Sequence, residues 1–228
     1  MIVLADDFRQ KLVAWNFDSQ IFQETTVLDE SLIEGFSTET INEKFLEKKT
    51  KLLFLARLES NKGVFEILEA YLQLNNKYPD LTLSFGGTGS ASEEMQRKIS
   101  EIGNPNIKLL GFVQGDLKKR ILQESHIFLF PSTHDEGLPN SVLEAMGAGM
   151  PVFTTWNAGI KDFFQDGEMG RVLENASSSH LAEKLKKLLD NRGLQTKMAI
   201  NNHQYAKEHF VASKVVTRLE KIYRQVVV

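Results

Sequence analysis

The stretch "KLLFLARLESNKGVFEILEAYLQLNNKY" (51–78) contains a short apolar run, a polar loop and a long segment of helical period. Residues 51–56 are almost all apolar, which predicts a buried strand, and from residue 64 onward the apolar residues recur at helical spacing. A strand, a loop and an amphipathic helix in this order form one β–α unit of a parallel sheet.

The same alternation continues toward the C-terminus. Further strands are predicted at 81–85, 107–112, 126–130 and 151–155, with "GRVLE" (170–174) as a candidate sixth. Helices are predicted up to about residue 102, at 115–124, from 139–141 onward and at 178–191. The predicted fold class is therefore α/β, a Rossmann-like parallel sheet with helices on both faces.

The two ends of the chain depart from this rhythm. Residues 1–45 combine a strand-like and a helix-like segment with an acidic stretch, and we interpret them as the end of a preceding domain and a linker. Residues 46–209 form the predicted sheet domain. Residues 210–228 have helical period with one apolar stripe, which needs a partner.

The composition excludes several classes of protein and site. A net charge of -3 argues against a broad nucleic-acid surface, and the basic run Lys118-Lys119-Arg120 is interpreted as a solvated helix face. The five His lack the paired helical spacing of a zinc site, so no metal site is predicted. The absence of Cys excludes disulfides and is compatible with a reducing cytoplasm. The opening "MIVLA" is too short for a signal peptide or membrane span, so neither is expected.

Ligands of open parallel sheets bind beyond the carboxyl ends of the strands, so a binding site is expected in the loops that follow the strands. The loop after the first strand carries two cations, Arg57 and Lys62. These could bind an anion or could merely solvate a turn. The next loop carries Gly86 and Gly87, whose missing side chains would let a ligand approach the backbone. The loop is an incomplete dinucleotide fingerprint, since Ser92 stands where the last glycine would fall. A plain tight turn is therefore an alternative interpretation of these glycines.

The stretch "EGLPNSVLEAMGAGMP" (136–151) follows the fourth strand. Its Gly-Leu-Pro-Asn start predicts a helix from 139–141, with Pro139 in the first turn or Asn140 as N-cap. Backbone N–H groups at a helix start attract anions, and a diphosphate there would be flanked by Arg57 and Lys62.

Glu144 lies about one turn into this helix, and helical side chains tilt back toward the N-terminus. A carboxylate beside a phosphate would be repelled. Glu144 is therefore expected to accept hydrogen bonds from neutral hydroxyls, as in a ribose diol. Glu136 at the loop start would suit a sugar ring in the same way.

Together these residues resemble the C-terminal, donor-binding domain of retaining nucleotide-sugar glycosyltransferases of the GT-B fold, glycosyltransferase family four. The resemblance covers about residues 50–210. It is carried by "ARLESNKG", "FGGTGS", "LLGFV", "PSTHDEGLPNSVLEAMGAGMPVFTT" and "AGIKDFFQDGEMGRVLE". The leading residues resemble the final strand and helix of the family's N-terminal domain. The tail resembles the helix that crosses back onto that domain.

The resemblance implies a role for each matching residue. Arg57 and Lys62 would hold the diphosphate and stabilise the departing nucleotide, and Glu144 would bind the ribose. The implied catalytic residues are Arg57, Lys62 and Glu136. The implied donor-binding residues are Gly86, Gly87, Phe112, Val113, Gly137, Leu138, Pro139, Asn140, Ser141 and Glu144. Within this set, Glu136 and the amides of Gly137 and Leu138 would hold the donor sugar, and Phe112 and Val113 would lie against the base. The sequence departs from the family pattern at Ala56, Thr88, Ser90, Lys161 and Asp162.

The implied reaction transfers a hexose-type sugar from a UDP-sugar or GDP-sugar to a glycan or lipid-linked acceptor, with retention and without a metal or other cofactor. Such a reaction fits polysaccharide biosynthesis. In the family the N-terminal domain supplies the acceptor site, so this chain by itself is expected to transfer little sugar. It would need that domain or a partner chain. The resemblance is also compatible with peripheral membrane association of the whole enzyme and with a homodimer through the C-terminal helix.

Three alternatives remain open from the residues. The first is a non-catalytic nucleotide-sugar-binding module that acts with a partner chain. The second is a Rossmann-like domain for a dinucleotide, and the third is a fragment of a GT-B epimerase or phosphorylase.

Overall fold

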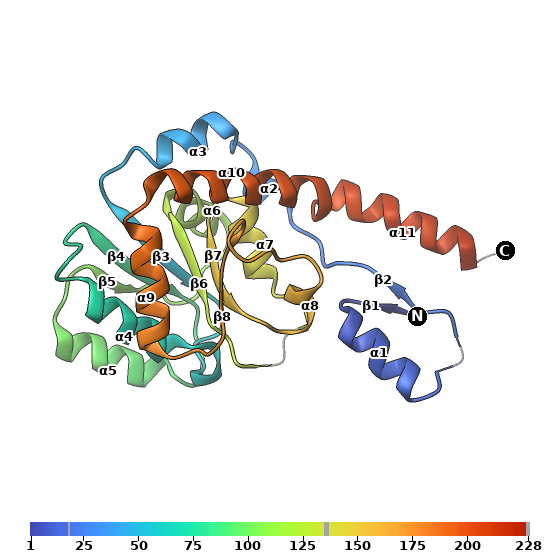
Figure 1. Cartoon of the computed structure of the whole chain (residues 1–228), viewed down its shortest axis with the longest axis horizontal. Coiled ribbons are helices and arrows are strands. Elements are labelled where there is room, and N and C mark those ends of the chain that lie inside the picture. The colour runs from blue at the N-terminus through green and yellow to red at the C-terminus, as the bar shows by residue number, and fades with distance from the viewer. Residues whose placement is uncertain (18, 135–136, 227–228) are drawn as a thin grey trace.

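The computed structural model describes residues 1–17, 19–134 and 137–226, and its centre is a six-stranded parallel sheet (Figure 1). The strand order is β5-β4-β3-β6-β7-β8. The strands are β3 (Thr50–Leu55), β4 (Leu81–Gly86), β5 (Ile107–Leu109), β6 (Ile127–Phe130), β7 (Val152–Thr155) and β8 (Gly170–Leu173). The predicted fold class and the candidate sixth strand are confirmed.

Each predicted strand differs from the observed one by at least one residue at an end, and the largest difference is at β5. β5 ends at Leu109 because Gly111, with φ +66°, turns the chain away. His126 precedes β6, although its backbone N–H donates to the Lys51 carbonyl at 2.8 Å.

Helices lie on both faces of the sheet (Figure 1). Those that follow the strands are α4 (Val64–Leu74), α5 (Ser92–Ile102), α6 (Gly115–Glu124), α7 (Asn140–Gly147), α8 (Ala158–Lys161) and α9 (Ser178–Leu189). α4 packs against α9, whereas α7 packs against α10 (Arg192–His209). α10 is the long helix that the sequence analysis did not predict.

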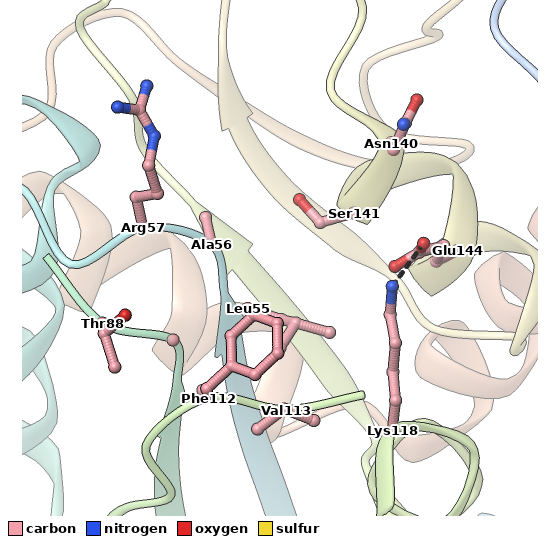
Figure 2. Close-up of a pocket in the computed structure, with 12 residues that line it drawn as sticks. Leu55, Ala56, Arg57, Thr88, Phe112, Val113, Lys118, Asn140, Ser141 and Glu144 are labelled. Carbon is pink, nitrogen blue, oxygen red and sulfur yellow. Dashed lines mark hydrogen bonds and ion pairs between the residues drawn. The ribbon is translucent and has the colours of Figure 1, made fainter. Parts of the chain in front are cut away.

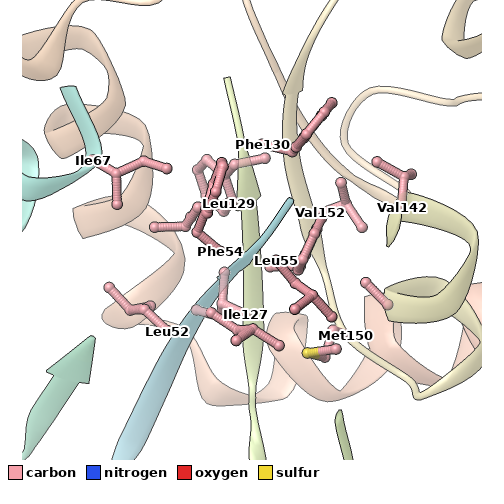
Figure 3. Packing of buried hydrophobic residues seen from close by; sticks show 14 of the residues in the cluster. Leu52, Phe54, Leu55, Ile67, Ile127, Leu129, Phe130, Val142, Met150 and Val152 are labelled. Carbon is pink, nitrogen blue, oxygen red and sulfur yellow. The ribbon is translucent and has the colours of Figure 1, made fainter. Parts of the chain in front are cut away.

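Burial on both faces explains why the central strands are continuous apolar runs. All four residues of β6 are buried, as are residues 52–55 of β3. Their side chains interlock with those of the covering helices, for example Ile67 on one side and Val142 on the other (Figure 3).

The order of the strands determines where a ligand can bind. From β3 the chain builds outward to β4 and β5, and it then returns to place β6 on the other side of β3. The loops after β3 and β6 therefore diverge, which opens a crevice at the carboxyl edge of the sheet.

The N-terminal segment forms a small unit beside this sheet. β1 (Ile2–Val3) and β2 (Phe22–Gln23) pair in parallel and are joined by α1 (Asp6–Ala14), which packs against α8 (Figure 1). Two short helices follow, α2 (Glu30–Ile33) and α3 (Thr38–Lys44).

The C-terminal helix α11 (Ala212–Val226) runs from the end of α10 toward the N-terminal unit (Figure 1). Its Arg218 donates to the buried carboxylate of Glu24 at 2.7 Å. Of the predicted apolar stripe, Phe210 and Val215 are buried while Val226 is exposed. No helix in the described part of the chain combines the length and the apolar character needed to cross a membrane.

Candidate functional site

A pocket of about 340 Å³ lies at the carboxyl ends of β3 and β4 and faces the start of α7 (Figure 2). Its lining residues are Leu55, Ala56, Arg57, Gly86, Gly87, Thr88, Phe112, Val113, Lys118, Asn140, Ser141 and Glu144. Most of the predicted donor-binding residues are among them, although they come from three separate segments: the end of β4, the loop before α6 and the start of α7. The sheet order therefore brings seven of the ten predicted donor-binding residues, and Arg57, to one pocket.

Arg57 follows β3 directly and projects along one side of the pocket. Its guanidinium is exposed and pairs with Glu59 at 2.8 Å. Figure 2 shows it across the pocket from Ser141 and Glu144 of α7. An anion bound between them would meet a cation on one side and a helix start on the other.

The loop after β4 needs glycine at position 87 for a reason that the sequence did not predict. Gly87 has φ +130°, and a Cβ there would lie 1.8 Å from the Ala56 carbonyl oxygen. The two loops are also joined by a hydrogen bond from the Leu58 N–H to the Thr88 carbonyl at 3.0 Å. The missing side chain therefore lets the two pocket loops pack against each other, in addition to leaving room for a ligand.

The helix start is close to its predicted position. α7 begins at Asn140 with Pro139 as its N-cap, so both predicted alternatives, Pro139 in the first turn and Asn140 as N-cap, are wrong by one residue. Within the described residues no side chain caps this helix. The first N–H groups, on Asn140 and Ser141 at the pocket wall, have no carbonyl partner within the helix, which is the arrangement that favours an anion.

Glu144 points into the pocket, as predicted, but it has a partner that the sequence analysis missed. The Lys118 ammonium lies 2.6 Å from its carboxylate (Figure 2). Burial raises the pKa of Glu144, and the hydrogen bond from Lys118 opposes that rise. The interpretation of the basic run as a solvated helix face is therefore wrong for Lys118. Its position one turn into the helix that follows Phe112 and Val113 was the available signal.

Lys62 does not line this pocket. It ends a 3₁₀ turn (Ser60–Lys62), only 4% of it is exposed, and its ammonium lies 6.0 Å from the centre of the Phe130 ring. Burial lowers the pKa of Lys62, and the nearby charge of Arg57 lowers it further.

The remaining predicted residues lie beyond the pocket. Gly137, Leu138 and Pro139 are not part of its lining, and a Cβ on Gly159 would lie 2.0 Å from the Gly137 carbonyl oxygen. Glu136 lies outside the described residues.

The arrangement combines three kinds of recognition in one pocket. Arg57 and the start of α7 suit a phosphate group, and Glu144 suits hydroxyl donors. Phe112, which is 68% exposed, and Val113 offer an apolar wall for a flat ring. Across residues 1–17, 19–134 and 137–226, no three His, Asp or Glu side chains gather closely enough to hold a metal ion.

Comparison with known proteins identifies the family of this chain. A model described as "Glycosyl transferases group 1" matches residues 37–205, most of the chain. The chain belongs to this family. The resemblance drawn from the sequence motifs is thus confirmed at the level of the family.

Two similar proteins show what share of a relative's length this glycosyltransferase chain covers. It is 26% identical to the capsular polysaccharide biosynthesis glycosyltransferase CapM of Staphylococcus aureus, over 98% of this chain and 60% of CapM. The crystal structure of Anabaena HepE in complex with UDP matches 99% of this chain and 63% of that one, with a TM-score of 0.81 and 19% identity. The chain therefore spans only part of the length of the proteins it matches.

A solved GtfA/B complex has the same fold over 99% of this glycosyltransferase chain and 45% of the matched chain, with a TM-score of 0.77 and 22% identity. Like the match to HepE, this likeness shows the GT-B fold.

Proposed function

We propose that this chain is the donor-binding half of a retaining glycosyltransferase that transfers a hexose-type sugar from a nucleoside diphosphate sugar to a glycan or lipid-linked acceptor. The observation that carries the proposal is the pocket at the crevice between β3 and β6, with Arg57 on one side and the start of α7 with Glu144 on the other. The structure of HepE with UDP and the role in capsule synthesis named for CapM support it.

The pocket suggests how the nucleotide lies. The diphosphate sits between Arg57 and the first N–H groups of α7, and the ribose hydroxyls donate to Glu144. The base packs against Phe112 and Val113. The hydrogen bond from Lys118 favours the ionised form of Glu144, and an ionised carboxylate is a stronger acceptor for the ribose.

The proposed chemistry depends on the charge of the leaving group. As the bond from the sugar C1 to the diphosphate breaks, negative charge grows on the departing nucleotide, and Arg57 stabilises that charge. Lys62 is proposed to stabilise the same charge on the diphosphate. Glu136, with the amides of Gly137 and Leu138, is proposed to hold the donor sugar. The proposed reaction uses no divalent metal or other cofactor.

The acceptor side is proposed to come from an N-terminal domain or a partner chain, and we propose that the whole enzyme is cytoplasmic. In that arrangement residues 1–45 belong to the N-terminal domain and its linker, 46–209 form the donor domain, and 210–228 cross back. Exposed apolar residues on the two terminal segments, which would contact the N-terminal domain or partner chain, support this proposal. They are Ile2, Leu4, Val13, Trp15, Val27, Val216, Tyr223 and Val226. The GtfA/B complex supports the version with a partner chain.

Calorimetric titration of the 228-residue chain tests the donor site. UDP, GDP and ADP are titrated with and without their sugars. We expect Arg57→Ala and Glu144→Ala to weaken both nucleotide and conjugate. Glu136→Ala should weaken only the conjugate. Each loss should be about 1.5–3 kcal/mol, the range for a hydrogen bond to a charged group.

Matched variants control for the loss of a charge alone. Arg97 and Glu101 form an exposed ion pair on α5, outside the pocket, so Arg97→Ala and Glu101→Ala should bind as the unmodified chain does. Equal affinities for all variants and ligands would refute the assignment. Robust sugar transfer to a simple acceptor by this chain alone would refute the proposal that the acceptor site lies elsewhere.

A further inference from the structure

A second pocket, which we call the Asn157 pocket, lies at the carboxyl ends of β6, β7 and β8. Its volume is about 350 Å³, and its lining comes from the loops after these strands, from α8 and from Asp7 of α1. Among the described residues the two pockets share no lining residue. The chain leaving β6 (Ser132–His134) lines the Asn157 pocket, whereas the start of α7 lines the donor pocket.

Asn157 is the residue that marks this pocket as a binding site. Only 7% of it is exposed, and neither its Oδ1 nor its Nδ2 atom has a hydrogen-bond partner in the described part of the chain. It precedes α8 as the N-cap, but its side chain does not cap that helix. A buried amide without partners is unfavourable, so a ligand that both donates and accepts hydrogen bonds would stabilise it.

The neighbouring side chains define the chemistry of that ligand. Trp156 is 49% exposed and offers a flat apolar surface at the pocket. Asp7 and Lys161 neutralise each other at 3.1 Å, so the carboxylate of Glu174 gives the pocket a negative charge. That charge repels phosphates and favours hydroxyl donors.

We propose that the Asn157 pocket binds a neutral sugar unit of the acceptor, and this inference rests on the proposed function. The amide of Asn157 pairs with two hydroxyls of the sugar, the Glu174 carboxylate accepts from a third, and the indole of Trp156 packs against a C–H face of the ring. The pocket is assigned to the acceptor because, among the described residues, its lining includes neither a donor-pocket residue nor Gly137 or Leu138, which are proposed to hold the donor sugar.

The two Trp residues of the chain make a site-specific test possible. Trp15 is 75% exposed on the N-terminal unit, so Trp15→Phe leaves Trp156 as the single indole with little expected effect on folding. Trp156 emission is then followed during titration with methyl α-glucopyranoside, methyl α-galactopyranoside and N-acetylglucosamine. We expect a saturable change with at least one of these sugars.

A second substitution tests whether the change in Trp156 emission depends on the amide of Asn157. In the Trp15→Phe background, Asn157→Ala should weaken sugar binding about thirtyfold, the loss of two ordinary hydrogen bonds. The same substitution should leave the urea midpoint of the free chain unchanged or higher, because it removes an unpartnered buried group. Asn76→Ala, at an exposed position after α4, should change neither quantity.

Saturating UDP-glucose distinguishes the acceptor sugar from the donor sugar. We expect the same affinity for the free sugar with and without UDP-glucose, whereas competition would assign the pocket to the donor and overturn the inference. Absence of a saturable response to all three sugars, with nucleotide binding intact, would also overturn it and would leave the proposed function standing. Loss of nucleotide binding with sugar binding intact would contradict the proposed function alone.

Discussion

The ammonium of Lys118 on α6 lies 2.6 Å from the carboxylate of Glu144 on α7, and both residues line the donor pocket. Two effects act on the carboxylate in opposite directions. Burial raises the pKa of Glu144, and the contact with Lys118 lowers it. The charge of a proposed ribose-binding group is therefore controlled by a residue on another helix.

Lys118→Met should make nucleotide binding sensitive to pH. Without Lys118 the pKa of Glu144 rises further, so more of the carboxylate is protonated as the pH falls from 8 to 6, and its hydrogen bond to the ribose weakens. Calorimetry with UDP at pH 8, 7 and 6 measures this effect. Lys119→Met, next along the helix and paired with Glu34, is the control. Parallel pH profiles for the two variants would contradict the prediction.

The same substitution should change stability in a direction set by linkage. A carboxyl group whose pKa is raised by folding contributes stability below its unfolded pKa and loses it as the pH rises through the folded pKa. In Lys118→Met the loss of stability with rising pH is larger, because no cation pairs with the buried carboxylate of Glu144. We expect unfolding at pH 7 to be easier by about 2 kcal/mol, with the difference narrowing toward pH 4.5 in urea titrations. A difference that grows as the pH falls would contradict this account.

Gly87→Ala should be strongly destabilising. A Cβ there would lie 1.8 Å from the Ala56 carbonyl oxygen in a backbone conformation with φ +130°, so the two pocket loops would have to separate. We expect a loss of about 3 kcal/mol in urea unfolding. Gly103→Ala is the matched control, since its φ is +64° and nothing lies within 4 Å of its Cβ position. It should lose only about 1 kcal/mol. Equal losses would mean that the contact with Ala56 is unimportant.

Arg218→Met should loosen the N-terminal unit. The guanidinium of Arg218 donates to both carboxylate oxygens of Glu24 and to the carbonyl of His209, and Glu24 is buried. Removing it leaves a buried carboxylate unpaired, at a cost of about 3 kcal/mol. Limited proteolysis should then cut residues 20–30 faster. Arg224→Met, in an exposed pair with Glu220, should leave the cleavage pattern unchanged. Unaltered cleavage in Arg218→Met would show that the pair does not hold the unit.

His126 should contribute to acid unfolding. Its neutral ring accepts from the Lys51 N–H through Nδ1, and its Nε2 donates to the Lys44 carbonyl at 3.0 Å. Burial lowers the pKa of His126 to about 3, so the unfolded chain takes up this proton first. Stability attributable to His126 is therefore lost as the pH falls from about 6.5 toward 3, by up to about 1.4 kcal/mol per pH unit.

His126→Gln tests that contribution, because Gln does not titrate. Its free energy of unfolding should fall less steeply than that of the unmodified chain between pH 6.5 and 4 in urea titrations. Identical slopes for His126→Gln and the unmodified chain would assign the acid sensitivity to other groups.

Local patterns in the sequence were enough to predict the β–α alternation and the helix start at α7. A buried strand such as β6 must be apolar on both faces, and an amphipathic helix must repeat its apolar residues with the helical period. Both patterns can therefore be recognised within a short stretch of sequence. The same reasoning placed Glu144 correctly, because its direction depends only on its distance from the helix start.

What only the tertiary structure decided concerns residues that are distant in the chain. The ion pair of Lys118 with Glu144, the position of Lys62 beside Phe130 and the packing of Gly87 on Ala56 each join separate β–α units. These contacts depend on the strand order, which places β6 beside β3 and β4 on its other side. No local window of sequence carries that order, because it follows from how whole strands and helices pack into one core.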